Sequence, residues 1–242
     1  MNKFAKILLL LLPLLFLLTV GYRHFFSGTG SLISGQAESS LNHLEKGENF
    51  TLVILGDSIT AGTNSPTNYT KLLNEQLSLF YPMATLQVIN AGVPGNTASM
   101  GLARLDSDVL AHHPDAVIIQ FGWNDMKDGV KADVFNENIR SIVDQLQAAT
   151  VRDIILLTTT QVDVSLANWK IRPFNKIIRS TAQEKGCILV DLFLAFQKEI
   201  QKGTTSITSL MSNDHIHPSE TGHQLLLRTI LPVFQRSNTP AN

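Results

Sequence analysis

The stretch that decides the fold is residues 50–63, which read FTLVILGDSITAGT. An unbroken apolar run at residues 52–55 passes directly into a glycine, an acidic residue and a hydroxyl residue. A strand that is apolar at every position has both faces covered, as in the parallel sheet of an α/β protein. Gly56 then leaves room for a tight turn, so that Asp57 and Ser58 stand at the carboxyl end of the strand.

The same pattern recurs along the chain. Four more runs of strand length that are wholly or mostly apolar lie at residues 86–89, 116–121, 154–157 and 188–190. Apolar residues at helical spacing lie between and after them, at residues 69–79, 134–146 and 169–182 and in a last helix that opens at 217–218. This alternation predicts a three-layer α/β domain whose central parallel sheet has about five strands. Ligands bind such sheets at the carboxyl ends of the strands.

The N-terminal region carries a targeting signal. Lys3 and Lys6 precede an uncharged apolar run at residues 7–20, which is typical of a signal peptide or of an uncleaved signal-anchor. Either form places the rest of the chain outside the cytoplasm, anchored in the membrane by the apolar run or secreted. The expected organisation is a signal at residues 1–22, a linker at residues 23–49 and the main domain at residues 50–236.

The composition fits a globular domain with a sizeable core. Of the 242 residues, 44% are hydrophobic and 16% are charged, and the formal net charge is −1. Because the charges are nearly balanced, the chain presents no broad basic surface, and we do not expect nucleic acid as a partner.

Ser58 is the first candidate for chemistry. A serine hydroxyl becomes a useful nucleophile only when a neighbouring base removes its proton. The alternative is that Asp57 or Ser58 merely caps the helix that follows. The stretch is not the G-x-S-x-G elbow of α/β-hydrolases, because Thr60 occupies the place of the second glycine.

A base for Ser58 is available in DHIHP at residues 214–218. Asp214 can fold back within one turn to accept the N–H of one ring nitrogen of His217, which leaves the other nitrogen to take the serine proton. Asp214, His215 and His217 could instead form part of a zinc site, but further ligands are not evident. We therefore expect neither a metal nor any other cofactor.

Donors for an oxyanion follow three successive strands. Acyl transfer builds negative charge on the carbonyl oxygen, and fixed N–H groups must meet that charge. The expected donors are the backbone N–H of Ser58, the backbone N–H of Gly92 and the side-chain amide of Asn124. Each has an ordinary alternative, since Gly92 and Gly95 also suit a turn and Asn124 a local side-chain hydrogen bond. Their occurrence together favours an oxyanion site.

These stretches, in this order, resemble the four blocks of the GDSL, or SGNH, hydrolase superfamily. GDSIT at residues 56–60 is similar to the first block, and NAG at residues 90–92 is similar to the second. GWND at residues 122–125 is similar to the third block, and DHIHP at residues 214–218 is similar to the last. The visible departure is Ile59, where the family name has leucine.

The resemblance implies a flavodoxin-like α/β/α sandwich that hydrolyses a carboxylic ester or thioester through an acyl-enzyme, without a metal. By position, Ser58 is similar to the nucleophile, and Asp214 and His217 are similar to the other members of the triad. Gly92 and Asn124 are similar to the oxyanion donors. The chain resembles bacterial lysophospholipase-like esterases, so its expected partner is an ester of a small molecule, a lipid or a glycan.

Three other functions remain open on the sequence. A carbohydrate O-acetylesterase acting on cell-envelope glycans would use the same residues. A flavodoxin-like flavin binder would hold a phosphate in the turn at residues 58–63, but it leaves Asp214 and His217 without a role. A non-catalytic module that binds acylated polymers would keep the hydrolase scaffold without its catalytic activity. The expected rims of an acyl site are residues 165–174 and 203–213.

Overall fold

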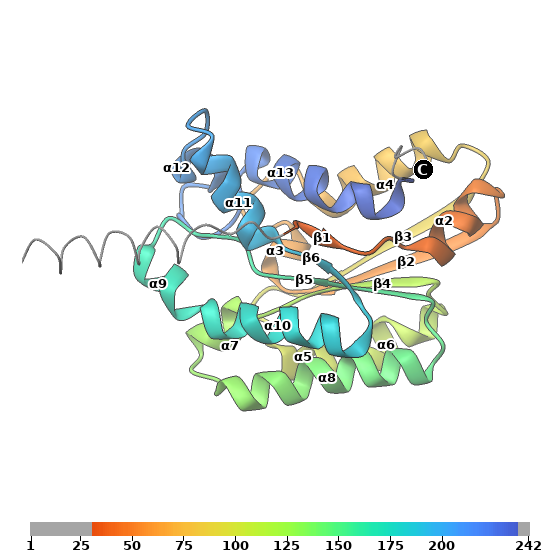
Figure 1. Ribbon diagram of the computed structural model, residues 1–242, viewed down its shortest axis with the longest axis horizontal. Coiled ribbons are helices and arrows are strands. Elements are labelled where there is room, and N and C mark those ends of the chain that lie inside the picture. Colours follow the sequence, from red (N-terminus) through yellow and green to blue (C-terminus); the bar gives the residue numbers. More distant parts are fainter. Residues whose placement is uncertain (1–30, 237–242) are drawn as a thin grey trace, which may run out of the picture. The chain divides into compact units, whose positions relative to one another are not determined.

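The computed structural model describes residues 31–236, which form an α/β/α sandwich around a six-stranded sheet (Figure 1). The strand order is β1-β6-β5-β4-β2-β3. The strands are β1 (Ile33–Ser34), β2 (Asn49–Gly56), β3 (Thr85–Gly92), β4 (Ala116–Gln120), β5 (Asp153–Leu157) and β6 (Ile188–Val190). The predicted three-layer α/β fold is confirmed.

The sheet is mixed rather than purely parallel. β2 to β6 are joined by parallel ladders, in which Gly56 pairs with Gly92 on one side and with Gln120 on the other. β1 runs antiparallel to β6, with Ile33 opposite Val190. The prediction of about five parallel strands missed β1, because two residues are too few to show an apolar pattern.

The central strands carry the core. All five residues of β4 are buried, and Val53 and Ile54 of β2 are completely inaccessible to solvent. β3 differs, because it lies at the edge of the sheet and several of its side chains are exposed. The unbroken apolar pattern therefore describes the covered strands well and the edge strand less well.

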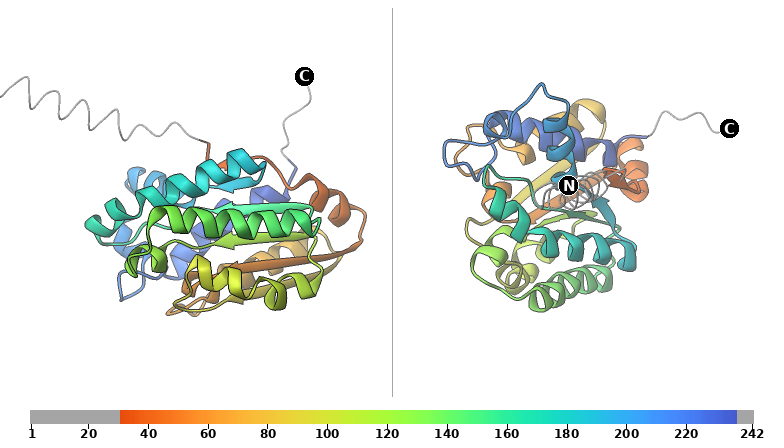
Figure 2. Two further views of the ribbon diagram at one scale, coloured as in Figure 1. Left: turned by 90° about the horizontal axis from the view of Figure 1, so that it is seen from below. Right: turned by 60° about the vertical axis from the view of Figure 1, so that its left-hand side comes forward.

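Helices cover both faces of the sheet (Figure 1). One layer contains α5 (Ala98–Ala103), α6 (Leu105–Asp108), α8 (Ala132–Ala148) and α10 (Arg172–Lys185). In the left view of Figure 2, α8 and α10 lie across this face. The other layer contains α2 (Glu38–Glu45), α4 (Tyr69–Phe80), α11 (Leu192–Gln201) and α13 (Glu220–Ile230). The short elements are α3 (Ser58–Ala61), η1 (Leu110–His112), α7 (Trp123–Lys127), α9 (Ser165–Lys170), α12 (Ile207–Leu210) and η2 (Leu231–Phe234).

Two predicted helices have different boundaries in the structure. The helix expected at residues 169–182 is divided into α9 and α10, and Pro173 in the first turn of α10 has no N–H with which to continue α9. The last helix was expected to open at residues 217–218, but α13 begins after Ser219. The Ser219 hydroxyl caps α13 by accepting the N–H of Gly222, at 3.2 Å.

The predicted linker at residues 23–49 is wrong for the part that the structure describes. Leu41 and Leu44 of α2 are 0% and 1% exposed. The backbone N–H and the hydroxyl of Ser40 both donate to Oδ2 of Asp153, at 2.7 and 2.6 Å. These buried contacts make α2 a part of the folded domain. The polar composition of this stretch concealed them, because only one narrow face of the helix is apolar.

The predicted signal at residues 1–22 lies outside the described residues. Between residues 31 and 236, no helix combines the length and the apolar character needed to cross a bilayer.

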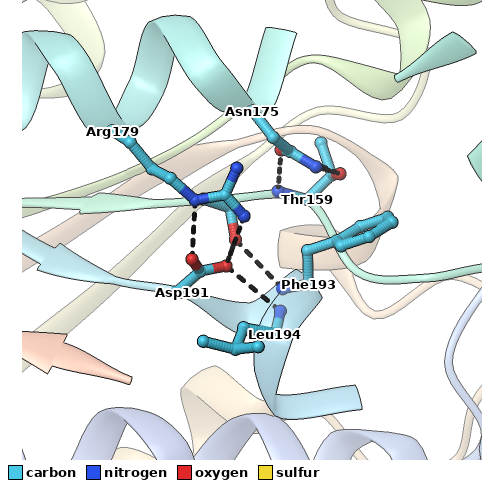
Figure 3. Close-up of polar contacts among 7 residues, drawn as sticks. Thr159, Asn175, Arg179, Asp191, Phe193 and Leu194 are labelled. Atoms are coloured by element: carbon cyan, nitrogen blue, oxygen red, sulfur yellow. Dashed lines mark hydrogen bonds and ion pairs between the residues drawn. The ribbon is translucent and has the colours of Figure 1, made fainter. Parts of the chain in front are cut away.

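A buried polar network joins the carboxyl ends of β5 and β6 to α10 (Figure 3). Arg179 donates from Nε and Nη2 to the two carboxylate oxygens of Asp191, at 2.6 and 2.9 Å. Asp191 also caps α11 by accepting the N–H of Leu194. The side-chain oxygen of Asn175 accepts the N–H of Thr159 at 2.9 Å. The network fixes the start of the loop that leads from β5 to α9.

Candidate active site

Ser58 is the first residue of the short helix α3, at the carboxyl end of β2. Asp57 caps this helix, since its Oδ1 accepts the N–H of Ile59 at 2.9 Å. The helix ends at Gly62, whose φ of +83° favours a residue without a side chain. The cap that was considered for Asp57 is therefore present, and it leaves the Ser58 hydroxyl available for other contacts.

Ser58 and His217 meet although they lie 159 residues apart in the chain. The Oγ atom of Ser58 is 2.8 Å from Nε2 of His217. Nδ1 of the same ring is 2.5 Å from Oδ2 of Asp214. The imidazole is thus placed to receive a proton from the serine on one side while the carboxylate orients it on the other.

Asp214 is held as a carboxylate by its surroundings. Burial acts to raise its pKa, but hydrogen bonds from the His217 ring, the backbone N–H groups of His217 and Ile216, and the Asn64 amide outweigh burial. The pKa of Asp214 therefore lies well below its ordinary value. The Asn64 contact measures 2.7 Å, and the Ser212 hydroxyl donates to Oδ1 at 2.8 Å.

Asn64 was not among the residues predicted for the site. It lies six residues after Ser58 and has a φ of +61°, a conformation that asparagine tolerates better than most residues. Its contact with Asp214 bridges 150 residues of sequence, so local spacing could not reveal it.

The neighbouring histidine has a different partner. Nδ1 of His215 lies 3.2 Å from Oδ2 of Asp163, whereas His217 faces Ser58 and Asp214. His215 has a φ of +62°, a backbone conformation that is uncommon for a residue other than glycine. Within the described part of the chain, no three His, Cys, Asp or Glu side chains form a group that could hold a metal ion.

The predicted oxyanion donors lie where strands end and short helices begin, with Ser58 first in α3, Gly92 last in β3 and Asn124 second in α7. The N–H of Gly92 is already engaged. The N–H of Gly92 donates to Oδ1 of Asn90 at 2.9 Å. A Cβ atom at Gly92 would overlap the backbone nitrogen of Ala61, so this glycine allows α3 to pack closely on β3. The Asn124 amide donates one N–H to the carbonyl oxygen of Asn96, at 3.0 Å, and keeps a second N–H.

Gly95 was predicted only as a turn residue, and its backbone N–H is a further candidate donor. The N–H of Asn96 donates to the carbonyl of Val93 at 3.2 Å, with Pro94 and Gly95 between them. Proline followed by a glycine with a φ of +82° is typical of a type II turn. Among residues 31–236, the N–H of Gly95 has no acceptor. The bond from Asn124 to Asn96 places this turn beside the Asn124 amide.

Asp57 and Asp125, the residues next to Ser58 and Asn124 in the chain, have buried carboxyl groups. Burial raises the pKa of Asp57 to about 7, and the charge of Asp125 adds to this effect. Burial likewise raises the pKa of Asp125 to about 6, although both oxygens of its carboxyl group accept the N–H of Ala98. Oδ2 of Asp57 has no hydrogen-bond partner in the described part of the chain. Close to neutral pH, ionisation of one of these two carboxyl groups therefore makes ionisation of the other less favourable.

A hollow of about 700 Å³ borders Asp214. Its lining residues come from the loop after α3 and from the stretch that ends at the first residue of α13, and they are Asn64, Pro66, Met211, Ser212, Asn213, Asp214, Ser219 and Glu220. Ser58 is not among them. Part of the predicted rim at residues 203–213 therefore lines a hollow on the Asp214 side of the site.

The site and the fold are similar to those of known proteins. A profile of the GDSL-like Lipase/Acylhydrolase family matches residues 54–225. The chain is 29% identical over 204 residues to an acetylxylan esterase of Geobacillus stearothermophilus, covering 74% of this chain and 91% of that protein. It is 27% identical over 187 residues to Esterase TesA of Pseudomonas aeruginosa, covering 76% of this chain and 88% of that protein.

Solved structures show the same similarity. The crystal structure of Axe2, an acetylxylan esterase of Geobacillus stearothermophilus, matches 78% of this chain and 95% of its own, with a TM-score of 0.70 and 26% identity. The structure of a lipase/acylhydrolase from Enterococcus faecalis matches 76% of this chain and 94% of its own, with a TM-score of 0.64 and 26% identity.

Proposed function

This chain belongs to the GDSL-like Lipase/Acylhydrolase family and is a carboxylic ester hydrolase, and we propose that Ser58 is its nucleophile, His217 its base and Asp214 the residue that orients the base. The observation that carries this proposal is the 2.8 Å separation of Ser58 Oγ from His217 Nε2. A hydrogen bond of that length is what proton transfer between these groups requires.

In the first half of the reaction, Ser58 Oγ attacks the carbonyl carbon while its proton passes to Nε2 of His217. The carbonyl oxygen becomes an oxyanion. When this intermediate collapses, the bond to the leaving oxygen or sulfur breaks, and the leaving group takes the proton from His217. The alcohol or thiol departs, and the acyl group remains on Ser58.

In the second half, a water molecule gives a proton to His217 and attacks the acyl carbon. The second tetrahedral intermediate expels Ser58 Oγ, which recovers the proton, and the carboxylic acid is released. Asp214 remains ionised throughout and stabilises the imidazolium that forms twice in each cycle. The depressed pKa of Asp214 supports this role.

The oxyanion is met by N–H donors at the carboxyl edge of the sheet. We assign the Ser58 backbone N–H and the second N–H of the Asn124 amide to it, as predicted. For the third donor we propose Gly95, because the N–H of Gly92 donates to Asn90 and the N–H of Gly95 is available. Gly92 could serve only if it gave up that bond to Asn90. Loss of one such donor typically costs about 3 kcal/mol of barrier.

The nucleophile is tested by covalent labelling. A fluorophosphonate should label the full-length protein on Ser58, and Ser58→Ala should abolish both labelling and the hydrolysis of p-nitrophenyl acetate. Ser107→Ala, which removes an exposed serine hydroxyl on the surface near η1, serves as the matched control and should retain both. Full activity of the Ser58→Ala variant would refute the proposal.

For the substrate we propose an ester or thioester with an apolar acyl chain. The second candidate is an acetylated glycan, because the acetylxylan esterase matches over 91% of its own length. A series of kcat/KM values across acyl chain lengths, with acetylated sugars and a lysophospholipid included, separates the two. Preference for acetyl over octanoyl esters, together with turnover of acetylated sugars, would favour the glycan.

We propose a location outside the cytoplasm, based on the apolar run at residues 7–20 that follows Lys3 and Lys6. This run either anchors the protein or is cleaved after export. The mass of the protein isolated from a membrane fraction distinguishes the two forms. Recovery of the protein in the cytoplasm, with Lys3 still present, would contradict export.

A further inference from the structure

We propose that the edge of the sheet bearing Ser58 faces a lipid bilayer, and that α9 with its neighbours touches the lipid. The inference rests on the proposed function, since it concerns how that site reaches its substrate. The contact surface, called here the rim patch, consists of Val164, Leu166, Trp169 and Ile216.

The rim patch is unusually apolar for a solvent-exposed surface. Leu166 and Trp169 are 62% and 61% exposed, and Val164 and Ile216 are 45% and 48% exposed. Single exposed apolar residues are common on proteins, whereas a group of large ones is a candidate contact surface, and its position relative to the proposed site then decides its role.

The four residues come from two segments that are joined by a hydrogen bond, one formed by Val164 and α9 and the other by the loop that contains Ile216. Leu166 and Trp169 are three residues apart on α9, so they lie on the same side of that helix. The N–H of Asp163 donates to the carbonyl of His215 at 3.0 Å, which brings the residue before Val164 beside the residue before Ile216. His215 in turn lies two positions from His217, so the patch adjoins the proposed active site.

The composition of α9 suits the boundary between lipid and water. Exposed Lys170 follows Trp169 directly. Tryptophan and lysine are both stable at this boundary, because each combines an apolar body with a polar end. Lys170 is also of the correct charge to meet anionic head groups.

The path of the chain supports this orientation. β1 runs antiparallel to β6, and the N–H of Asp191 donates to the carbonyl of Leu32 at 2.8 Å. Leu32 therefore lies just beyond the carboxyl end of β6, at the same edge of the sheet as Ser58. In Figure 1 this is the end of the sheet from which the chain leaves β5 for α9.

Leu32 is also close in sequence to the apolar run. It lies twelve positions after Val20, the last residue of the run. Such a segment reaches about 40 Å at most when fully extended. If the run lies in a membrane, the chain therefore holds the domain near the bilayer by the edge that carries the site.

A second group of exposed apolar residues provides an internal contrast. Leu79, Phe80 and Met83 are 73%, 49% and 82% exposed, and they precede β3. They therefore lie at the amino edge of the sheet, opposite to Ser58. The proposal requires that lipid contacts the rim patch and not this group.

Fluorescence of the full-length protein in vesicles tests the orientation. The chain has two tryptophans, and Trp123 is only 8% exposed, so Trp169 is the residue that lipid can reach. In phosphatidylcholine vesicles that contain phosphatidylglycerol, brominated acyl chains should quench the emission of the wild type. Trp169→Phe should lose this quenching.

In the control, the tryptophan that reports on lipid contact lies at the amino edge of the sheet. A Trp169→Phe protein that also carries Met83→Trp should not be quenched by the same vesicles. Quenching at position 83 that equals or exceeds the quenching at Trp169, or the absence of quenching at Trp169, would overturn the proposal.

Activity tests the consequence for catalysis. The readout is the ratio of kcat/KM for a lysophospholipid in these vesicles to kcat/KM for p-nitrophenyl octanoate in solution, because both substrates carry an apolar acyl chain and only the first is presented at a bilayer. In Leu166→Ser/Trp169→Ser this ratio should fall about tenfold, because less apolar surface enters the lipid. In Leu79→Ser/Met83→Ser it should be unchanged.

The outcomes separate this inference from the proposed function. If Leu166→Ser/Trp169→Ser lowers both reactions equally, the patch belongs to the acyl site or to the fold, and the docking proposal is overturned. If the wild type shows no hydrolysis that depends on Ser58, the proposed function fails, while the quenching result still decides which edge faces the lipid.

Discussion

At the scale of single residues, the site depends on the orientation of one imidazole. Asp214 fixes the His217 ring through a 2.5 Å contact and is itself held by Asn64 and two backbone N–H groups. With Asn64 and Ser212 also bound to it, the carboxylate has little freedom to turn. Its substitution therefore tests orientation more than folding.

We expect Asp214→Asn to lower kcat by about 10⁴, because an amide at this position favours the wrong tautomer of His217. Hydrolysis of p-nitrophenyl acetate and the melting temperature are the measurements. Asp163→Asn is the matched control, since Asp163 faces the neighbouring His215 in the same manner. An equal loss in both variants would show that the effect arises from the loop and not from the triad.

Substitution of Gly92 by alanine should affect stability, whereas substitution of Gly95 by alanine should affect kcat. Gly92→Ala should lower the melting temperature by several degrees, because its Cβ would overlap the backbone of Ala61. Gly95→Ala has open space but requires a φ of +82°, so relaxation of the turn should tilt its N–H and lower kcat about tenfold or more, with little loss of stability. If Gly95→Ala keeps full kcat while a folded Gly92→Ala loses it, Gly92 is the donor.

The sequence identified candidate site residues where a chemically suitable side chain lies in a short motif of recognisable spacing. Ser58, Asp214 and His217 could be selected because each belongs to a short motif at a strand end or a helix start, and the structure brings these three together. The hydrogen bond from the Gly92 N–H to Asn90 and the hydrogen bond from Asn64 to Asp214 could not be predicted. Both hydrogen bonds form only after distant segments have packed.

At the scale of elements, covered strands were recognised and weakly patterned ones were not. The apolar runs of β2, β4 and β5 are continuous because both faces of each strand are buried. β1 has two residues, and α2 is a short helix with little apolar surface and no side-chain cap. Such elements form because they pack against other parts of the fold. These tertiary contacts leave no pattern in the local sequence.

The role of α2 can be measured. Leu44→Ala should lower the free energy of unfolding by about 2–5 kcal/mol, because it leaves a cavity where a side chain is 1% exposed. Leu79→Ala, at a position that is 73% exposed, is the control and should change stability little. Urea denaturation of the full-length protein in detergent provides the comparison. If the two variants are equally stable, residues 38–45 do not contribute to the stability of the domain, and the prediction of a linker holds for them.

At the scale of the whole molecule, the buried carboxyl groups couple stability to pH. Burial raises the pKa of Asp57 to about 7, whereas an aspartate in the unfolded chain titrates near ~3.9. Between these values the folded state holds a proton that the unfolded state has lost. The contribution of Asp57 therefore weakens the fold as pH rises from about 4 to 7.

We expect Asp57→Asn to remove this dependence while keeping the cap, since an asparagine oxygen can still accept the N–H of Ile59. Relative to the wild type, the variant should gain stability as pH increases from 4 to 8, by a few kcal/mol at most. Urea denaturation at several pH values measures the difference. Asp106→Asn, at an exposed position, is the control. A difference that stays constant with pH would show that Asp57 is ionised in the folded protein at low pH as well.

The long separation between Ser58 and His217 has a consequence for biogenesis. The ribosome adds the histidine 159 residues after the serine. A nascent chain therefore carries the Ser58 hydroxyl before the imidazole that we propose as its proton acceptor has been made. On the proposed mechanism, hydrolysis begins only after the segment that carries His217 has been synthesised and has docked beside Ser58.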